Sequence, residues 1–437
     1  MSVGFFDPGV SPGLLRECLR QDAPPFSEVE LESFVSGYLD RRQVFLDILT
    51  DVASPLYVLD RAVLHRRAAE FQETFRSRFA DTGFYYAVKS NNHPLVAATL
   101  VEAGMGLDVS SGLELEMALA TEAKEIVFSG PGKTLEELRL AAHNHERVVL
   151  LIDSFGELER IGALLSGTGK TLRTGVRLTT DTRGLWRKFG IPPGRLPEFI
   201  ARAGAMPQIR LEGIQFHTSW NMGPAPQADF IRRLGEVLSR LPQAALARFR
   251  FIDIGGGYWP SEGEWLQPAG TRAGMVRKSL GMEPGGPLEH YRIQASPLSA
   301  FAEEISRAVG EHLLPVLSCR ICFEPGRWLS HGCMHLLLTV TDRKEDDLVI
   351  TDGGTNVVGW ERFETDYFPV INLSRPSLEE KPCHVLGSLC TPHDVWGYSY
   401  WGGDIREGDV LLIPEQGAYT WSLRQHFIKP VPEVVAI

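Results

Sequence analysis

The stretch FYYAVKSNN (84–92) decides how the rest of this chain is interpreted. Its first five residues are apolar, as expected of a buried strand, and Lys89 follows directly at the strand end. An amine in that position can condense with a carbonyl group. Because a lysine at a strand end is also common on protein surfaces, Lys89 gains weight only if other reactive residues occupy equivalent places.

Eight short apolar runs, this stretch included, follow one another with helix-like spacing between them. Capping boxes of Thr134 with Glu137 and of Ser154 with Glu157 indicate where two of the intervening helices begin. Alternating strands and helices predict an α/β fold of right-handed parallel units, and eight units close a TIM barrel. A doubly wound open sheet is the alternative. The runs are FYYAVK (84–89), GLDVSS (106–111), EIVFSG (125–130), RVVLLID (147–153), TGVRLTT (174–180), LEGIQFHT (211–218), FRFIDIGGGY (249–258) and CRICFEPGR (319–327).

After about residue 330 the pattern changes to shorter strands separated by charged turns, which predicts a separate β-rich domain. We expect residues 1–55 to form a helical extension, residues 56–315 the barrel, and residues 316–437 the β-rich domain. The strand predicted around Tyr57 is expected to join that last domain, so both chain ends would build it.

Composition narrows the class of protein. Of 437 residues, 43% are hydrophobic and 23% charged, which is ordinary for a globular protein. The net charge of −11 argues against broad binding to nucleic acid or to anionic membranes. No apolar run approaches the roughly 20 residues of a membrane span, and the N-terminus does not resemble a secretory signal. Six cysteines in this length do not form a disulfide framework, so a cytoplasmic location is expected.

Residues with chemical potential recur at the carboxyl ends of the predicted strands. In a TIM barrel these ends form the active face, because the loops that follow all strands meet there. Their common placement predicts one functional site. The residues are Lys89, Asp108, Arg177, His217, Gly255, Gly256, Gly257, Glu324 and Arg327.

Four of these features point to one cofactor. The glycines 255–257 form either a tight turn or a loop whose N–H groups hold a phosphate. Glu324 forms either a local ion pair with Arg327 or a partner for a protonated ring nitrogen. His217 is either a core histidine or a flat ring that stacks on an aromatic group. A phosphate-binding loop, an acid for a ring nitrogen, a stacking ring and the Lys89 amine are together the groups that bind pyridoxal phosphate (PLP).

From about residue 55 to 430 the sequence resembles the fold-type III PLP-dependent decarboxylases of diaminopimelate, ornithine and arginine. This resemblance implies an alanine racemase-like barrel followed by a C-terminal β-rich domain. The matching motifs, in order, are YYAVKSNN, GLDVSSGLELEMAL, GPGKTLEEL, KFGI (188–191), FHTS, DIGGGY, FEPGR, LCTPHDV and GAYTW.

The resemblance also implies roles for individual residues. Lys89 would form the imine link to the cofactor, His217 would stack on its ring, and Glu324 would pair with its ring nitrogen. Cys390 would be the second catalytic residue and would reach the partner's site in a head-to-tail homodimer. Barrel-type racemases place an arginine near the ring nitrogen, so Glu324 favours decarboxylation. The implied cofactor-binding set is Lys89, His217, Gly255, Gly256, Gly257, Glu324, Arg327 and Tyr419.

Two departures from the family bear on the substrate. Thr391 follows Cys390 where the basic-amino-acid enzymes carry an acid, and Trp220 stands where they carry a phosphate-binding serine, for which Ser219 is a candidate replacement. The Cys-Thr-Pro-x-Asp form (390–394) is closest to decarboxylases of carboxylate siderophore biosynthesis, which act on citryl amino-acid conjugates. Arg375 aligns with an arginine that binds substrate carboxylate. The implied substrate-binding residues are Arg375, Thr391 and Asp394.

Other functions remain open. The chain could decarboxylate diaminopimelate or another basic amino acid, or be an inactive homologue that binds PLP or a protein partner. A P-loop at GPGKT (130–134) lacks its first glycine, because Val127 stands there. A zinc site at Cys319 and Cys322 is disfavoured by their position within a strand, so no metal is expected. We therefore expect a cytoplasmic, homodimeric PLP-dependent lyase that acts on a small amino-acid-type substrate.

Overall fold

The computed structural model describes residues 12–20, 22–359 and 368–437. The residues that it describes divide into a β-rich unit, which lies within 1–60, 262–295 and 331–437, and a barrel unit, residues 61–261 and 296–330. These bounds differ from the expected ones in three respects. The eighth barrel strand lies beyond residue 315, an arm inserted at 262–295 belongs to the β-rich unit, and residues 56–60 belong to that unit rather than to the barrel.

The barrel unit contains a closed barrel of eight parallel strands in the order β11-β2-β3-β4-β5-β6-β7-β8, which confirms the predicted TIM-type fold. The chain closes the barrel because β11, the last strand, pairs with both β8 and β2. The strands are β2 (Thr82–Ala87), β3 (Gly106–Val109), β4 (Ile126–Phe128), β5 (Val148–Ile152), β6 (Leu172–Leu178), β7 (Ile209–Phe216), β8 (Phe251–Asp253) and β11 (Arg320–Phe323).

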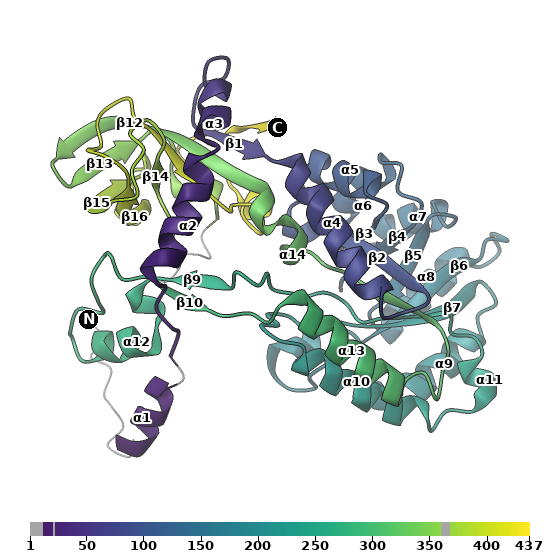
Figure 1. Cartoon of the computed structure of the whole chain (residues 1–437). Helices are drawn as coiled ribbons and strands as arrows, with labels where there is room; N and C mark the ends of the chain where they lie inside the picture. Colours follow the sequence, from purple (N-terminus) through teal and green to yellow (C-terminus); the bar gives the residue numbers. More distant parts are fainter. Residues whose placement is uncertain (1–11, 21, 360–367) are drawn as a thin grey trace. The chain divides into compact units, whose positions relative to one another are not determined.

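Helices alternate with these strands along the chain and surround them (Figure 1). The predicted capping box at Thr134 forms in full, because the Thr134 and Glu137 side chains each bond the other's backbone N–H. At Ser154 only half of the predicted box forms: Ser154 caps the Glu157 N–H, but the Glu157 side chain bonds elsewhere. The helices are α4 (Arg61–Arg76), α5 (Pro94–Glu102), α6 (Gly112–Leu119), α7 (Leu135–His143), α8 (Phe155–Leu165), α9 (Leu196–Gly204), α10 (Ala225–Leu238), α11 (Gln243–Leu246), α13 (Leu298–His312) and α14 (Arg327–Ser330).

An aromatic cluster anchors α4 to the barrel. Phe71 and Phe75 lie four residues apart, hence on one helix face, and both are fully buried. Phe75 packs on Phe323 of β11 with ring centroids 4.2 Å apart, and Phe323 stacks on Phe84 of β2 at 5.5 Å. Each buried phenylalanine contributes about 1.5–3 kcal/mol relative to exposure. The cluster therefore stabilises the closure between the first and last strands.

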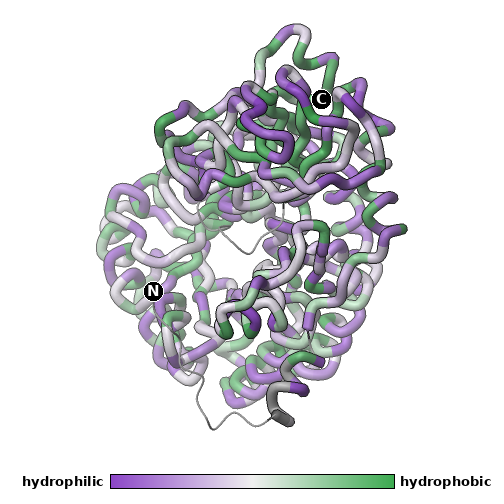
Figure 2. The backbone as a smooth tube through the Cα atoms, turned by 90° about the vertical axis from the view of Figure 1, so that its left-hand side faces the viewer, coloured by the Kyte–Doolittle hydropathy of each residue, from purple (hydrophilic) through white to green (hydrophobic). Residues whose placement is uncertain are grey.

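The β-rich unit contains an eight-stranded sheet in the order β13-β15-β16-β14-β17-β12-β1-β18, with an added pairing of β12 with β13. β1 pairs antiparallel with β12 and parallel with β18, so segments near both chain ends meet in this sheet. Figure 2 shows hydrophobic stretches of backbone around the C-terminus, which lies in this unit. They are β1 (Leu56–Leu59), β12 (Met334–Glu345), β13 (Leu348–Thr351), β14 (Ile371–Asn372), β15 (Glu380–Leu386), β16 (Val395–Trp401), β17 (Val410–Ile413) and β18 (Glu433–Ala436).

Helices and the inserted arm complete this unit. Val35 of α2 (Glu28–Leu39) and Phe45 of α3 (Arg42–Ile48) are buried in one cluster with Leu56, Val58 and other strand residues. The remaining elements are α1 (Pro12–Arg20) near the N-terminus and, in the arm, β9 (Glu264–Leu266), α12 (Arg272–Ser279) and β10 (Tyr291–Ile293). In the described part of the chain, no helix has the length and hydropathy needed to span a bilayer.

Candidate active site

Lys89 lies where β2 gives way to a short 3-10 turn, Val88–Ser90. Its Nζ is 3.2 Å from Oδ2 of Asp108, which lies on the neighbouring strand β3. The Asp108 carboxylate is buried and also accepts a hydrogen bond from Ser129 at 2.6 Å. The Lys89 side chain is 37% exposed. A fixed carboxylate thus holds an accessible amine at the carboxyl end of the barrel.

Glu324 is buried beyond the end of β11 and is 2% exposed. Nε2 of Gln215 donates to its Oε2 at 3.2 Å. Burial, together with the charges of Asp108 and Asp253, raises the pKa of Glu324 well above its ordinary value. Burial likewise raises the pKa of Asp253 to about 7. Three buried carboxyl groups so close together favour a proton or a positively charged partner.

His217 follows β7 and presents a neutral ring. The Gly256 N–H donates to its Nδ1 at 3.1 Å, so the ring proton is on Nε2, which lies 3.1 Å from Ser219 Oγ. Burial and the nearby charges of Lys89 and Arg177 lower the pKa of His217 well below its ordinary value. An uncharged flat ring held from both nitrogens is suited to stacking on an aromatic ligand.

The glycine loop after β8 leaves no room for larger residues. Gly255 and Gly257 have φ values of +70° and +85°. A Cβ at Gly256 would lie 2.2 Å from the Glu324 carbonyl oxygen, so this loop packs directly on the segment that carries Glu324. Two of its N–H groups are used internally: Gly255 donates to Asp253 at 2.9 Å and Gly256 to His217. The third N–H, that of Gly257, has no hydrogen-bond acceptor among the described residues.

Arg327 begins α14, three residues after Glu324. Its guanidinium carbon lies 4.1 Å from the ring centroid of Trp259, which follows the glycine loop. The Trp259 and Trp220 rings lie 5.4 Å apart, and Trp220 is 65% exposed with φ +58°. The cation–π contact places Arg327 close to the residue that follows the glycine loop by two positions, and its part in phosphate binding stays a prediction.

The remaining predicted residues lie in the β-rich unit. Cys390 is exposed and Thr391 half-buried on the loop between β15 and β16. Nε of Arg375 donates to Oδ2 of Asp409 at 3.1 Å, so this bond fixes one side of the guanidinium. Tyr419 has a backbone φ of +61° in the loop after β17.

Asp394 organises the loop that carries Cys390. Its Oδ1 accepts from the N–H and the hydroxyl of Thr355 at 2.7 and 2.9 Å, and its Oδ2 accepts from the Leu389 N–H at 2.7 Å. Because Asp394 is buried, these bonds give it a structural role in its own loop. Its contact with substrate stays a prediction.

Sequence reasoning missed Gln215 and Asp253 as site residues. Gln215 precedes His217 by two positions and Asp253 precedes Gly255 by two. Alternate residues of a strand point to the same face, so this spacing was the available signal. Neither residue belongs to a catalytic motif by itself. For that reason neither was included among the candidate site residues.

Several buried polar atoms at the barrel site have no hydrogen-bond partner among the residues that the structure describes. They are Nε of Arg177, Oε1 of Gln215 and Oδ2 of Asp253. The barrel unit holds the three kinds of group that PLP needs. They are an acid cluster for its ring nitrogen, an amine for its aldehyde, and a glycine loop with an arginine for its phosphate. This donor set fits the cofactor.

The GPGKT motif has a structural explanation. Lys133 and Glu157 side chains are each 1% exposed, and their Nζ and Oε1 atoms are 2.9 Å apart. Nζ also donates to the carbonyls of Gly130 at 2.6 Å and Leu151 at 2.9 Å. The lysine therefore ties the ends of β4 and β5 to the start of α8, and it is engaged by protein acceptors rather than presented to a nucleotide.

We expect Lys133→Met to lower the free energy of unfolding by about 3–5 kcal/mol, because Glu157 becomes a buried, unpaired charge. Lys133→Met/Glu157→Met should recover most of that loss, because no charge is then left buried. Urea unfolding followed by circular dichroism measures both, with the exposed Lys124→Met as a matched control. An equal loss in the single and double variants would contradict this account.

A parallel barrel with a lysine, a buried acid, a neutral histidine and a glycine loop at its carboxyl face defines a PLP-binding barrel enzyme. The model of the family "Pyridoxal-dependent decarboxylase, pyridoxal binding domain" matches residues 62–331, more than half of the chain. The chain belongs to this family and is a PLP-dependent amino-acid decarboxylase.

Individual relatives agree with this assignment. A 2-[(L-alanin-3-ylcarbamoyl)methyl]-2-hydroxybutanedioate decarboxylase of Staphylococcus aureus is 25% identical over 379 residues, 80% of this chain and 86% of that protein. Diaminopimelate decarboxylase of Methanothermobacter thermautotrophicus is 24% identical, covering 90% and 88%. The fold is similar to solved diaminopimelate decarboxylases of M. jannaschii (TM-score 0.74, 23% identity, 89% and 88% coverage) and Helicobacter pylori (0.72, 22%, 90% and 94%).

Proposed function

We propose that this enzyme decarboxylates an amino acid conjugated to a carboxylate-rich group, such as the citryl conjugates of carboxylate siderophore biosynthesis. The observation that carries the proposal is Thr391, a neutral residue where the enzymes for basic amino acids carry an acid. The S. aureus relative, whose name gives a substrate with a hydroxybutanedioate group, supports it.

Positive charge at the barrel face also supports an anionic substrate. The loop after β6 carries Arg183, Arg187 and Lys188, all exposed, in a chain whose net charge is −11. The base of this loop is fixed beside the site, because Ile191 donates its N–H to the Arg177 carbonyl at 2.9 Å. Cations on this loop would attract the carboxylates of a conjugate.

We assign the residues of the barrel as follows. Bound PLP supplies an electron sink for the bond that breaks at Cα of the substrate. Lys89 would hold the cofactor through its amine, and Glu324 would pair with the protonated ring nitrogen. His217 would lie against the ring, and Arg327 and the glycine loop would hold the phosphate. The family resemblance implies a phosphate-binding role for Tyr419 of the β-rich unit as well.

Cys390 completes the reaction by donating a proton to Cα after CO2 has left. We infer that it comes from the partner of a head-to-tail homodimer, so each site needs two chains. This inference rests on the family resemblance.

The cytoplasmic location stays a prediction.

A turnover screen tests the substrate class. CO2 release should be measured from a citryl–diaminopropionate conjugate, from free diaminopimelate and from free ornithine. We expect turnover of the conjugate alone. In Arg375→Gln its KM should rise about tenfold with little change in kcat, because a charge-assisted hydrogen bond to the distal carboxylate is lost.

Release of CO2 from diaminopimelate and none from the conjugate would refute this proposal and favour the second candidate, a diaminopimelate decarboxylase. The many diaminopimelate decarboxylases among the relatives keep that candidate in the screen. No CO2 release from any substrate by protein that has bound PLP would favour the inactive-homologue alternative.

A further inference from the structure

A cavity of about 610 Å³ lies within the β-rich unit, and none of the residues assigned above lines it. One wall is the inserted arm around α12, and the other is the face of β15 and β16. Its volume is in the range of sites for small molecules, about 300–1,000 Å³. It is therefore large enough for a ligand of its own.

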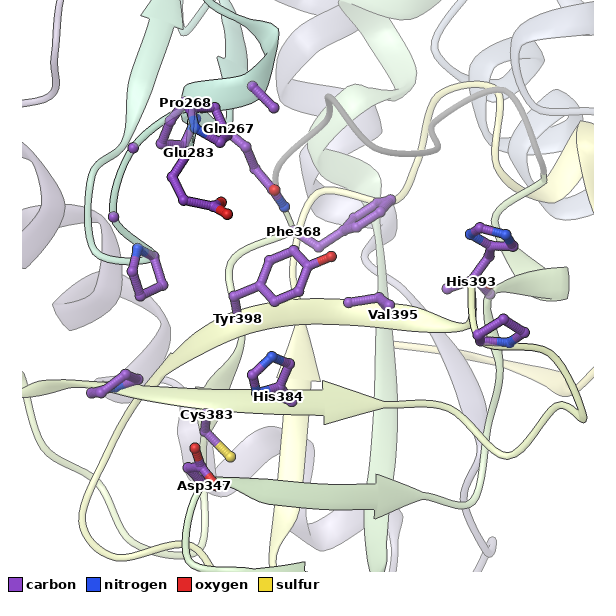
Figure 3. A pocket seen from close by; sticks show the side chains of 18 of the residues that line it. Gln267, Pro268, Glu283, Asp347, Phe368, Cys383, His384, His393, Val395 and Tyr398 are labelled. Atoms are coloured by element: carbon purple, nitrogen blue, oxygen red, sulfur yellow. The ribbon is translucent and has the colours of Figure 1, made fainter. Parts of the chain in front are cut away.

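Aromatic side chains form the floor of this cavity. His384 on β15 and Tyr398 on β16 are exposed on one sheet face, and their rings meet edge to face with centroids 5.5 Å apart. Phe368 lies beside them (Figure 3). His384 is exposed between the buried Cys383 and Val385, so the strand alternation brings its ring to the sheet face that lines the cavity.

Carboxylates lie at the edges. Figure 3 shows the Glu283 side chain extending toward the rings of Phe368 and Tyr398. Glu283 and Asp347 both line the cavity, and neither has an ion-pair partner among the residues that the structure describes. Lys278 also lines it, so the lining residues that the structure describes include two carboxylates and one ammonium group. Aromatic faces together with carboxylates are the groups that bind organic cations.

The cavity is connected to the loop that carries Cys390. Pro392 and His393 of that loop line it, and so does Thr355, which holds the loop through Asp394. An occupant would thus contact both the loop and its anchor. A ligand there can change how Cys390 is presented without touching the barrel site.

We propose that this cavity binds a small organic ammonium ion and that its occupancy controls the Cys390 loop. The expected ligand is an organic ammonium ion that carries no carboxylate, because Glu283 and Asp347 would repel a carboxylate group.

Calorimetric titration of the PLP-loaded protein with choline tests the proposal, because a quaternary ammonium ion cannot form an imine at Lys89. Its neutral isostere 3,3-dimethylbutan-1-ol is the ligand control. We expect saturable choline binding that weakens about tenfold in Glu283→Gln and in Tyr398→Ala. Glu407→Gln, an exposed glutamate of the same unit that does not line the cavity, should bind choline like the parent.

Choline should also change kcat in the parent and not in Glu283→Gln. Equal binding of the alcohol, or equal choline binding in Glu283→Gln and Glu407→Gln, would overturn the proposal. Lys89→Ala should bind choline normally, so failure of the proposed decarboxylation and failure of this site are separable outcomes.

Discussion

Replacing Lys89 with alanine should lower the decarboxylation rate by roughly 10³-fold or more, as removal of a covalent catalytic residue does in other enzymes. The variant should also lose the visible absorbance band of lysine-bound PLP. The physical reason is that Lys89 is accessible and oriented by Asp108, whereas Lys133 of the same unit is buried among three acceptors and cannot replace it. Absorbance spectra and CO2 release from the same preparations measure both effects.

The matched control is Lys124→Ala, an exposed lysine that follows α6, which should keep parental activity and absorbance. Persistence of the band in Lys89→Ala would show that another amine holds the cofactor. Such a result would remove the basis for every residue role assigned in the barrel.

The same variant tests whether sites are shared between chains. Lys89→Ala and Cys390→Ala should each be inactive as homodimers. If each site takes Cys390 from the partner chain, a dimer of one Lys89→Ala chain and one Cys390→Ala chain has one intact site out of two. Half of the dimers in an equal mixture are of this mixed kind, so about one quarter of parental activity should return after subunit exchange. No recovery after verified exchange would place Lys89 and Cys390 of one site on the same chain.

Glu324→Gln should reduce kcat by about 10²–10³-fold, the effect of removing a preorganised electrostatic group from an active site. The carboxylate is 2% exposed and lies near Asp108 and Asp253, so its negative charge is costly until a protonated ring nitrogen neutralises it. A glutamine has nearly the same shape but cannot hold that proton. Steady-state kinetics with matched PLP content measure the loss.

Two variants separate this electrostatic role from a structural one. Glu324→Asp should recover part of the activity, because it keeps the charge while shortening the side chain. Glu311→Gln, on the exposed end of α13, should have no effect. Unchanged kcat in PLP-loaded Glu324→Gln would mean that another group pairs with the ring nitrogen.

The barrel could be predicted because strand runs and helical segments alternate regularly from FYYAVK to FEPGR. Local propensity and hydrophobic period determine such elements, and eight parallel units have few ways to close. The domain bounds could not be predicted from local propensity and hydrophobic period. The arm at 262–295 leaves the barrel between β8 and β11, and its membership in the β-rich unit depends on contacts distant in sequence.

The sequence by itself determined which reactive groups stand at strand ends, namely Lys89, His217, Glu324 and the glycines 255–257, because strand period and turn residues are local properties. Only the tertiary structure decided their chemical states. Burial and the charge of Asp108 raise the pKa of Glu324, the Gly256 N–H selects the neutral tautomer of His217, and Glu157 pairs with the buried Lys133. Each of these partners lies far along the chain or on another element. Charge and desolvation act through space, so the fold had to bring these groups together before their protonation could be known.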